Sequence, residues 1–176
     1  MYLKQEGNFM DTKFIIDRLA HNDGVFREIL TGITGDQIQW RPAPDKWSMI
    51  EIVNHLYDEE QFDFRERVKA SLENREAPPI DPQGWVKSKK YAERDYVQSV
   101  ANFLLERERS VVWLRSLKDV NWESKWTNPQ FEMTAYGFLV NWLAHDYLHI
   151  RQINRMNYLY LNEITGEQSL QYAGEW

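Results

Sequence analysis

Apolar residues recur at helical spacing in four stretches of this 176-residue chain. In the first stretch, for example, Ile15, Leu19, Phe26 and Ile29 fall on one helical face. The pattern predicts helices over about residues 11–31, 48–74, 91–117 and 134–160. No stretch alternates like a strand over a convincing length, so we expect an all-α protein. Four long helices of this kind favour a four-helix bundle.

Polar residues mark where two of these helices begin. Ser48 followed by Glu51 fits the capping box, in which each side chain bonds the other's backbone N–H. Thr134 stands where it can cap the fourth helix. Gly32 and Gly35 end the first helix.

The connectors are longer than a simple up-down bundle needs, since neighbouring helices are usually joined by ~2–8 residues. They therefore leave room for crossovers. Prolines and tryptophans in residues 35–47 predict an extended loop pinned onto the bundle, and the prolines of residues 77–85 predict another loop. A third connector covers residues 118–133. The aromatic residues of the tail, residues 161–176, suggest that it docks on the body.

Charge and composition exclude several classes of protein. The length fits one domain over residues 1–176, and 21 Lys and Arg against 27 Asp and Glu give a formal net charge of -6. This acidic balance argues against nucleic acid as the main partner. No run approaches the ~20 apolar residues of a membrane span, and residues 1–7 lack the apolar stretch of a signal peptide. We expect a cytoplasmic protein.

The chain has no cysteine, which excludes disulfides, thiolate ligands and a cysteine nucleophile. A metal site would therefore have to use His, Asp or Glu. His145 and His149 are four residues apart and share one face of the predicted fourth helix. The same face carries Phe138, Trp142, Gln152 and Met156. Buried polar groups without partners cost roughly 1–3 kcal/mol each, and a metal ion would satisfy this pair.

His55 supplies a third imidazole from the second helix, on the face of Ile52, Glu59 and Phe62. A histidine so placed is usually a packed core residue, but two more on a partner helix favour a ligand. Three neutral imidazoles with open positions are typical of a catalytic site, and Zn²⁺, Ni²⁺, Fe²⁺ and Mn²⁺ all accept them. Asp58 or Glu59 could orient an imidazole or handle a proton.

Other metal sites fit the sequence less well. His145-Asp146-x-x-His149 has the spacing of the zinc-protease pattern, but aspartate replaces its glutamate, and only Glu163 or Glu167 could complete the site. A ferritin-like di-iron bundle needs Glu-x-x-His repeats, which are absent. Haem ligation by both histidines fails, because neighbours on one helix face cannot lie on opposite sides of one iron.

Arg107 is a further candidate for a role near such a site, whereas His21 is not. Arg107 interrupts the apolar seam of the third helix, so it either reaches solvent, pairs structurally or places a cation near the site. We expect Glu59 to be its partner, with Arg107 in the substrate pocket. His21 lies on the side of Phe14 and Val25, and we expect an exposed or packing position for it rather than a ligand.

Scattered residues in a fixed order resemble the DinB/YfiT-like superfamily. They are Trp40, Pro42, Trp47-Ser48, Glu51, His55-Leu56 and Glu59, then His145-Asp146-x-x-His149-x-x-Gln152-Ile153. The resemblance runs roughly from Asp11 to Tyr160. It implies a four-helix bundle of up-down-down-up topology with long connecting loops, often a homodimer. It also implies a divalent metal, zinc or nickel, held by three histidines that match His55, His145 and His149. His21 has no counterpart.

The resemblance implies a range of reactions. Activities in the superfamily include thiol-dependent S-transferases that use bacillithiol, mycothiol or glutathione, a thiol-dependent isomerase and metal-dependent hydrolases. We therefore expect a metal-dependent enzyme that transfers a small-molecule thiol to an electrophilic substrate, with Glu59 or Asp58 assisting proton movement. One alternative is hydrolysis, and the other is a non-enzymatic, metal-containing binding or stress protein that sequesters a small ligand. Aromatic walls for the substrate would come from Trp40, Trp47, Trp85, Trp122 and Trp126 if these gather at the metal.

Overall fold

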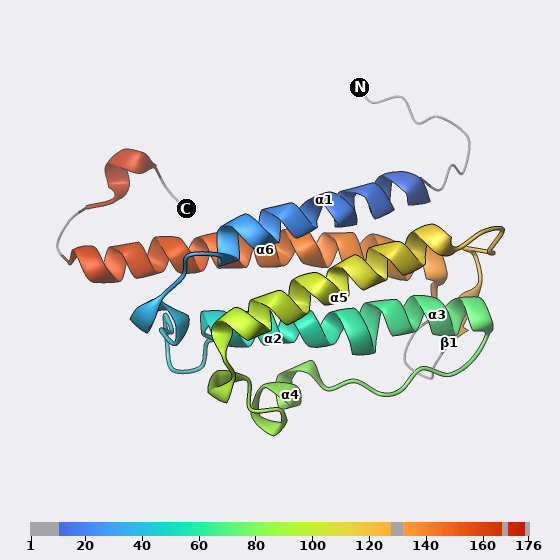
Figure 1. Ribbon diagram of the computed structural model, residues 1–176, viewed down its shortest axis with the longest axis horizontal. Coiled ribbons are helices and arrows are strands. Elements are labelled where there is room, and N and C mark those ends of the chain that lie inside the picture. Colours follow the sequence, from blue (N-terminus) through green and yellow to red (C-terminus); the bar gives the residue numbers. More distant parts are fainter. Residues whose placement is uncertain (1–10, 128–131, 167–168, 175–176) are drawn as a thin grey trace.

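A computed structural model describes residues 11–127, 132–166 and 169–174. Four helical rods pack side by side along most of their length (Figure 1). The first is α1 (Thr12–Leu30), and the third and fourth are α5 (Tyr96–Ser116) and α6 (Ala135–Thr165). The predicted all-α four-helix bundle is confirmed. Among the described residues, no helix is long and apolar enough to cross a lipid bilayer.

The second rod contains a change of helical pitch. It consists of α2 (Met49–Glu59), one π-helical turn (Glu60–Phe64) and α3 (Arg65–Glu73). A π-turn holds more residues than an α-turn, so the inward face is reached later in the sequence than regular spacing predicts. Phe64 is buried and Phe62 is 45% exposed. The expectation that Phe62 shares the inward face of His55 was therefore wrong.

The rods follow an up-down-down-up order. α1 and α6 run in one direction, and α2–α3 and α5 run in the other (Figure 1). α5 packs against α1 and α2, while α6 packs against α1 and α3. Because α2–α3 and α5 are parallel, the chain must return along the bundle between them. The crossover at residues 74–95 makes this return, and it includes the short helix α4 (Pro82–Ser88).

The predicted capping signals are confirmed. Ser48 and Glu51 form the capping box at the start of α2, and the Thr134 hydroxyl accepts a bond from the Gly137 N–H at the start of α6. Asp95 caps α5 in the same way, so this helix begins at Tyr96 rather than near residue 91. α6 extends to Thr165, beyond the predicted end near residue 160.

The connectors and the tail differ from the simplest expectation in three places. Residues 77–85 are not all loop, because Asp81 caps α4 and Pro82 fits its first turn. Residues 118–133 contribute to a two-stranded antiparallel hairpin of β1 (Lys125–Thr127) and β2 (Glu132–Thr134). Strands of three residues are too short to show alternation. Tyr172 in the tail is fully exposed, so this ring does not dock on the body, and Trp176 lies outside the described residues.

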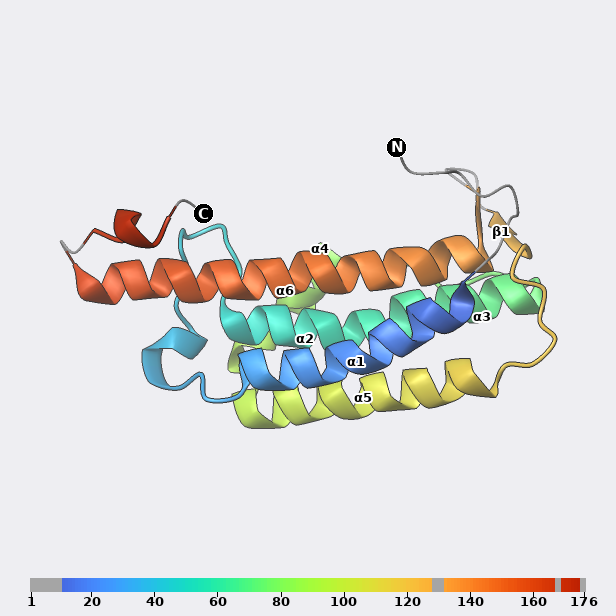
Figure 2. The same ribbon diagram turned by 90° about the horizontal axis from the view of Figure 1, so that it is seen from above.

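Two apolar clusters fill the bundle, one at each end. The first surrounds Trp142 and Leu139, near the β-hairpin end, and the second surrounds Phe26 and Phe103. The hairpin and the 3₁₀ turn Gln171–Ala173 lie at opposite ends of the molecule (Figure 2). Each rod has buried polar residues between the parts of it that join the two clusters. The bundle therefore has a polar layer at its middle, and the candidate site lies there.

Candidate metal centre

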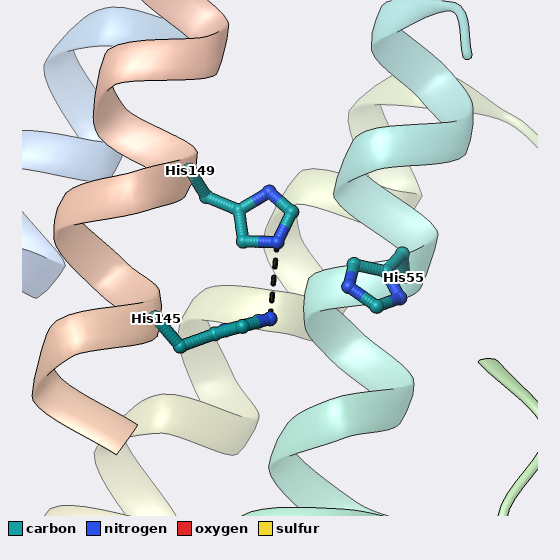
Figure 3. A group of neighbouring side chains, drawn as sticks. All are labelled: His55, His145 and His149. Carbon is teal, nitrogen blue, oxygen red and sulfur yellow. Dashed lines mark hydrogen bonds between the residues drawn. The ribbon is translucent and has the colours of Figure 1, made fainter. Parts of the chain in front are cut away.

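Three histidines from two rods converge in this layer. His55 projects from α2, and His145 and His149 project from successive turns of α6 (Figure 3). One nitrogen from each ring lies within 4.8 Å of the others. The Nε2 atoms of His145 and His149 are 3.0 Å apart, and the His55 ring centroid is 5.5 Å from that of His145 and 5.0 Å from that of His149. The three rings face a common point.

Burial keeps all three imidazoles neutral near physiological pH. Desolvation is the main cause in each case, since the charged form is disfavoured away from water. It lowers the pKa of His55 to about 3, of His145 to about 2 and of His149 to about 4. The mutual repulsion of the charged rings adds to the effect at His55 and His145. Neutral imidazole is the form that binds metals.

Several polar atoms around the cluster are buried without a hydrogen-bond partner. They include Oε1 of Glu59 and the Nδ1 atoms of His55 and His149, which point away from the common point of the rings (Figure 3). The atoms that a metal ion would bind are the nitrogens that face one another. Two Nε2 atoms 3.0 Å apart also match the spacing of ligands that share one ion, because metal–nitrogen distances are about 2.0–2.1 Å. The three histidines fit a borderline divalent metal such as Zn²⁺ or Ni²⁺.

Glu59 and Asp58 have different surroundings, although they are adjacent. The Glu59 carboxylate lies 3.7 Å from Nδ1 of His55, where it can orient that ring. Burial, with the neighbouring carboxylate of Asp63, raises the pKa of Glu59 to about 9. Asp58 instead accepts a hydrogen bond from the Tyr91 hydroxyl and pairs with Lys89 at 3.0 Å. Its carboxylate is therefore engaged in holding the crossover onto α2.

Aromatic rings close part of the site, but not the set that we expected. Trp47 packs 4.8 Å from the His55 ring, and Phe64 packs 4.9 Å from the His145 ring, measured between centroids. The other connector tryptophans contact different regions. Trp40 meets Tyr160, Trp85 meets Phe62, Trp126 meets Phe138 and Trp122 packs on the apolar cluster around Trp142. Of the five predicted, Trp47 is the one with a ring contact to the triad.

The expected partner of Arg107 was wrong. Arg107 is buried, but it binds Glu60 and Asp146 rather than Glu59. The π-turn begins at Glu60, and this carboxylate reaches the bundle centre while Glu59 faces His55. Sequence analysis missed Glu60 and Phe64 because regular helical spacing gives no sign of the turn. Asp146 was part of the recognised motif, but its pairing with Arg107 was not predicted.

The remaining candidates lie away from the cluster. His21 is exposed, as expected. Glu163 is also exposed on the last turns of α6, and Glu167 lies outside the described residues. The nitrogen that completes the His145/His149 pair comes from His55, so the geometry does not resemble the zinc-protease alternative.

Comparison with known families agrees with this arrangement. The sequence profile of the DinB superfamily matches residues 18–153. This chain belongs to the DinB superfamily. The matched range contains His55, His145 and His149, together with all four rods in whole or part.

One solved structure of the DinB-like type has the same fold. It is YfiT from Bacillus subtilis, described as a probable metal-dependent hydrolase with an unusual four-helix bundle topology. The two chains align with a TM-score of 0.74 over 89% of this chain and 91% of YfiT, at 21% sequence identity. At this identity the likeness establishes the fold alone. No protein with curated annotation gives a significant match.

Proposed function

We propose that this DinB-superfamily protein is a metal-dependent enzyme that holds Zn²⁺ or Ni²⁺ on His55, His145 and His149. The observation that carries the proposal is the convergence of three neutral, buried imidazole nitrogens within 4.8 Å. A bound ion would lower the pKa of a water or a thiol and polarise a carbonyl group. Three neutral ligands add no negative charge to the site, so it favours an anionic partner.

The proposed reaction is the transfer of a small-molecule thiol to an electrophilic substrate. The chain has no cysteine, so the sulfur would arrive with a cosubstrate of the bacillithiol, glutathione or mycothiol class. Holding thiol and electrophile side by side makes their reaction effectively unimolecular, which can lower a barrier by about 7–11 kcal/mol. The rings of Trp47 and Phe64 pack against His55 and His145 and would help to hold the two reactants together.

We propose that Glu59 supports the metal ligands and the proton transfer. Its carboxyl group would hold Nδ1 of His55, 3.7 Å away, and so fix the ring with its other nitrogen toward the common point. It would also hold a proton beside the site, because burial raises its pKa to about 9. Asp58 is withdrawn from this role by its bonds to Tyr91 and Lys89.

Hydrolysis is the second candidate reaction. It is favoured by the description of YfiT as a probable metal-dependent hydrolase, together with the shared fold. The same three histidines and Glu59 would serve, with water in place of the thiol.

A thiol-conjugation assay tests the proposed reaction. Metal-loaded protein would be incubated with bacillithiol, glutathione or mycothiol and the model electrophile monochlorobimane, with His145→Ala as the control. We expect conjugation with at least one thiol to be faster than with the variant. Equal rates for all three thiols would overturn thiol transfer, and a parallel panel of ester and amide substrates would then test hydrolysis.

We also propose small molecules as the partners and a homodimer as the assembly, as the family resemblance implies. One chain has a mass of 21.2 kDa. Light scattering coupled to gel filtration would give twice that mass for the dimer, and the single-chain mass would overturn it.

A further inference from the structure

A group of buried charged side chains lies beside the neutral histidines, at the centre of the bundle. Arg107 on α5 donates two bonds of 2.6 Å to the two oxygens of Asp146 on α6. Its Nε donates to Oε1 of Glu60 in the π-turn at 2.8 Å. All three residues are at most 1% exposed. Paired bonds between a guanidinium and a carboxylate are strong and fix the geometry of both groups.

Every rod contributes to this Arg107 network. From α1, the Asn22 side chain donates to Asp146 at 2.9 Å, and the Leu19 carbonyl accepts a bond from Arg107 at 3.4 Å. From α6, the Trp142 ring nitrogen donates to Glu60 at 2.8 Å. A change in the network would therefore be felt in the relative placement of all four rods.

The network also touches the histidine cluster. Asp146 directly follows His145 on α6, and Glu60 directly follows Glu59, which faces His55. Phe64 stacks on Trp142 on one side and contacts His145 on the other, at centroid distances of 5.8 and 4.9 Å. The network thus joins the two helices that carry the histidines, immediately behind them.

Stability alone is a weak explanation for these charges. Desolvation of a buried ion pair can exceed its attraction, and apolar residues of similar volume are often as stabilising or more so. One guanidinium faces two carboxylates here, and burial raises the pKa of the Glu60 carboxyl group, so the network need not carry a net negative charge. Its bonds join α6 to the π-turn that follows α2, and these two helices carry the three histidines.

We propose that Arg107, Asp146 and Glu60 are positioning residues of the metal centre, which set its affinity by fixing α2 against α6. This role rests on the metal binding proposed above. Removal of groups behind metal ligands typically weakens metal affinity 10–100-fold, and we expect a loss of that size here.

The test separates affinity from stability. In a triple variant, Glu60→Met, Arg107→Met and Asp146→Leu would replace the network by apolar side chains. We expect the metal-free variant to be at least as stable in urea as the wild type, yet to bind Zn²⁺ 10–100-fold more weakly in competition with a chelating dye. The single variant Asp146→Asn keeps the shape of the side chain, and we expect a loss of affinity in the same direction.

The matched control is Tyr96→Phe. It removes another buried hydrogen bond, from the Tyr96 hydroxyl to the Leu30 carbonyl at 3.0 Å, within the apolar cluster around Phe26. We expect it to lose stability and to keep its affinity for Zn²⁺.

Each outcome bears on the proposal. If the folded triple variant binds Zn²⁺ with wild-type affinity, the proposal is overturned. If that variant does not fold, wild-type Zn²⁺ affinity in Asp146→Asn would overturn the proposal. Equal weakening in Tyr96→Phe would also overturn it, because affinity would then follow stability. A wild-type protein that binds no Zn²⁺ or Ni²⁺ would overturn the metal site itself, which distinguishes the two failures.

Discussion

Two polar groups occupy the middle layer of the bundle, and they differ in what holds them together. In the Arg107 network, the guanidinium pairs with both carboxylates, and Asn22 and Trp142 donate further bonds, although Oε2 of Glu60 has no partner. In the histidine cluster, one nitrogen of each of three neutral rings lies within 4.8 Å of the others, and the Nε2 atoms of His145 and His149 can share at most one hydrogen bond. The comparison indicates that opposite charges within the chain hold the first group together, whereas the second offers ligand atoms to something the chain does not supply.

The largest expected effect is on metal binding itself. His149→Ala removes one of three converging ligands, and we expect it to abolish most binding of Zn²⁺ or Ni²⁺ in equilibrium dialysis with metal analysis. His21→Ala is the matched control, because His21 is exposed and outside the cluster. Equal binding by wild type and His149→Ala would remove the distinction between the two polar groups.

A single substitution in the Arg107 network should lower the stability of the metal-free protein. Arg107→Met leaves the buried carboxylates of Glu60 and Asp146 without their cation. Breaking a buried pair in this manner typically costs about 3–5 kcal/mol. We expect a loss of that size in the free energy of unfolding of the metal-free protein, measured in urea. A loss below about 1 kcal/mol would mean that the pairing is not needed, since that is the range of exposed pairs.

Acid should weaken the metal-free protein through the histidines. The pKa values of His55, His145 and His149 are lowered to about 3, 2 and 4 from 6.5. Below pH 6.5 the unfolded chain therefore takes up protons that the folded chain does not, and stability falls with falling pH. Each histidine contributes about 1.4 kcal/mol per pH unit in that range. Burial raises the pKa of Glu59 and of Glu60, and these two groups oppose part of this slope. Urea titrations at pH 7, 6 and 5 measure the slope, and His145→Gln should reduce it by about 1.4 kcal/mol per pH unit. An unchanged slope would contradict the buried, neutral state of His145.

The smallest effect is expected far from both groups. Thr134→Ala removes the hydroxyl that accepts from the Gly137 N–H at 2.9 Å, and loss of such a cap costs about 1 kcal/mol. We expect thermal unfolding to show this loss with Zn²⁺ affinity unchanged. Weaker Zn²⁺ binding would show that the start of α6 also controls the site.

Local signals in the sequence were enough to predict the bundle and much of the site. Helical periodicity located the four rods, and Ser48 and Thr134 located two helix starts. The spacing of His145 and His149 placed both rings on one face, where the structure brings them to His55.

The predictions that were wrong concern parts of the structure that depend on tertiary contacts. The π-turn after Glu59 leaves no mark on local hydrophobic spacing, so the partners of Arg107 could not be assigned correctly. The hairpin strands around residues 125–134 are paired with each other and are too short to alternate. The tryptophans of the connectors could be recognised as buried or half-buried, but their positions around the bundle are set by packing.

The identity of the atoms around a bound ion would decide whether the histidine cluster is a metal centre. X-ray absorption spectroscopy on zinc-loaded protein reports those atoms and their distances. We expect three imidazole nitrogens at about 2.0–2.1 Å in the wild type, and fewer in His55→Ala. A shell of oxygen ligands without imidazole, or the same shell in His55→Ala, would contradict the account.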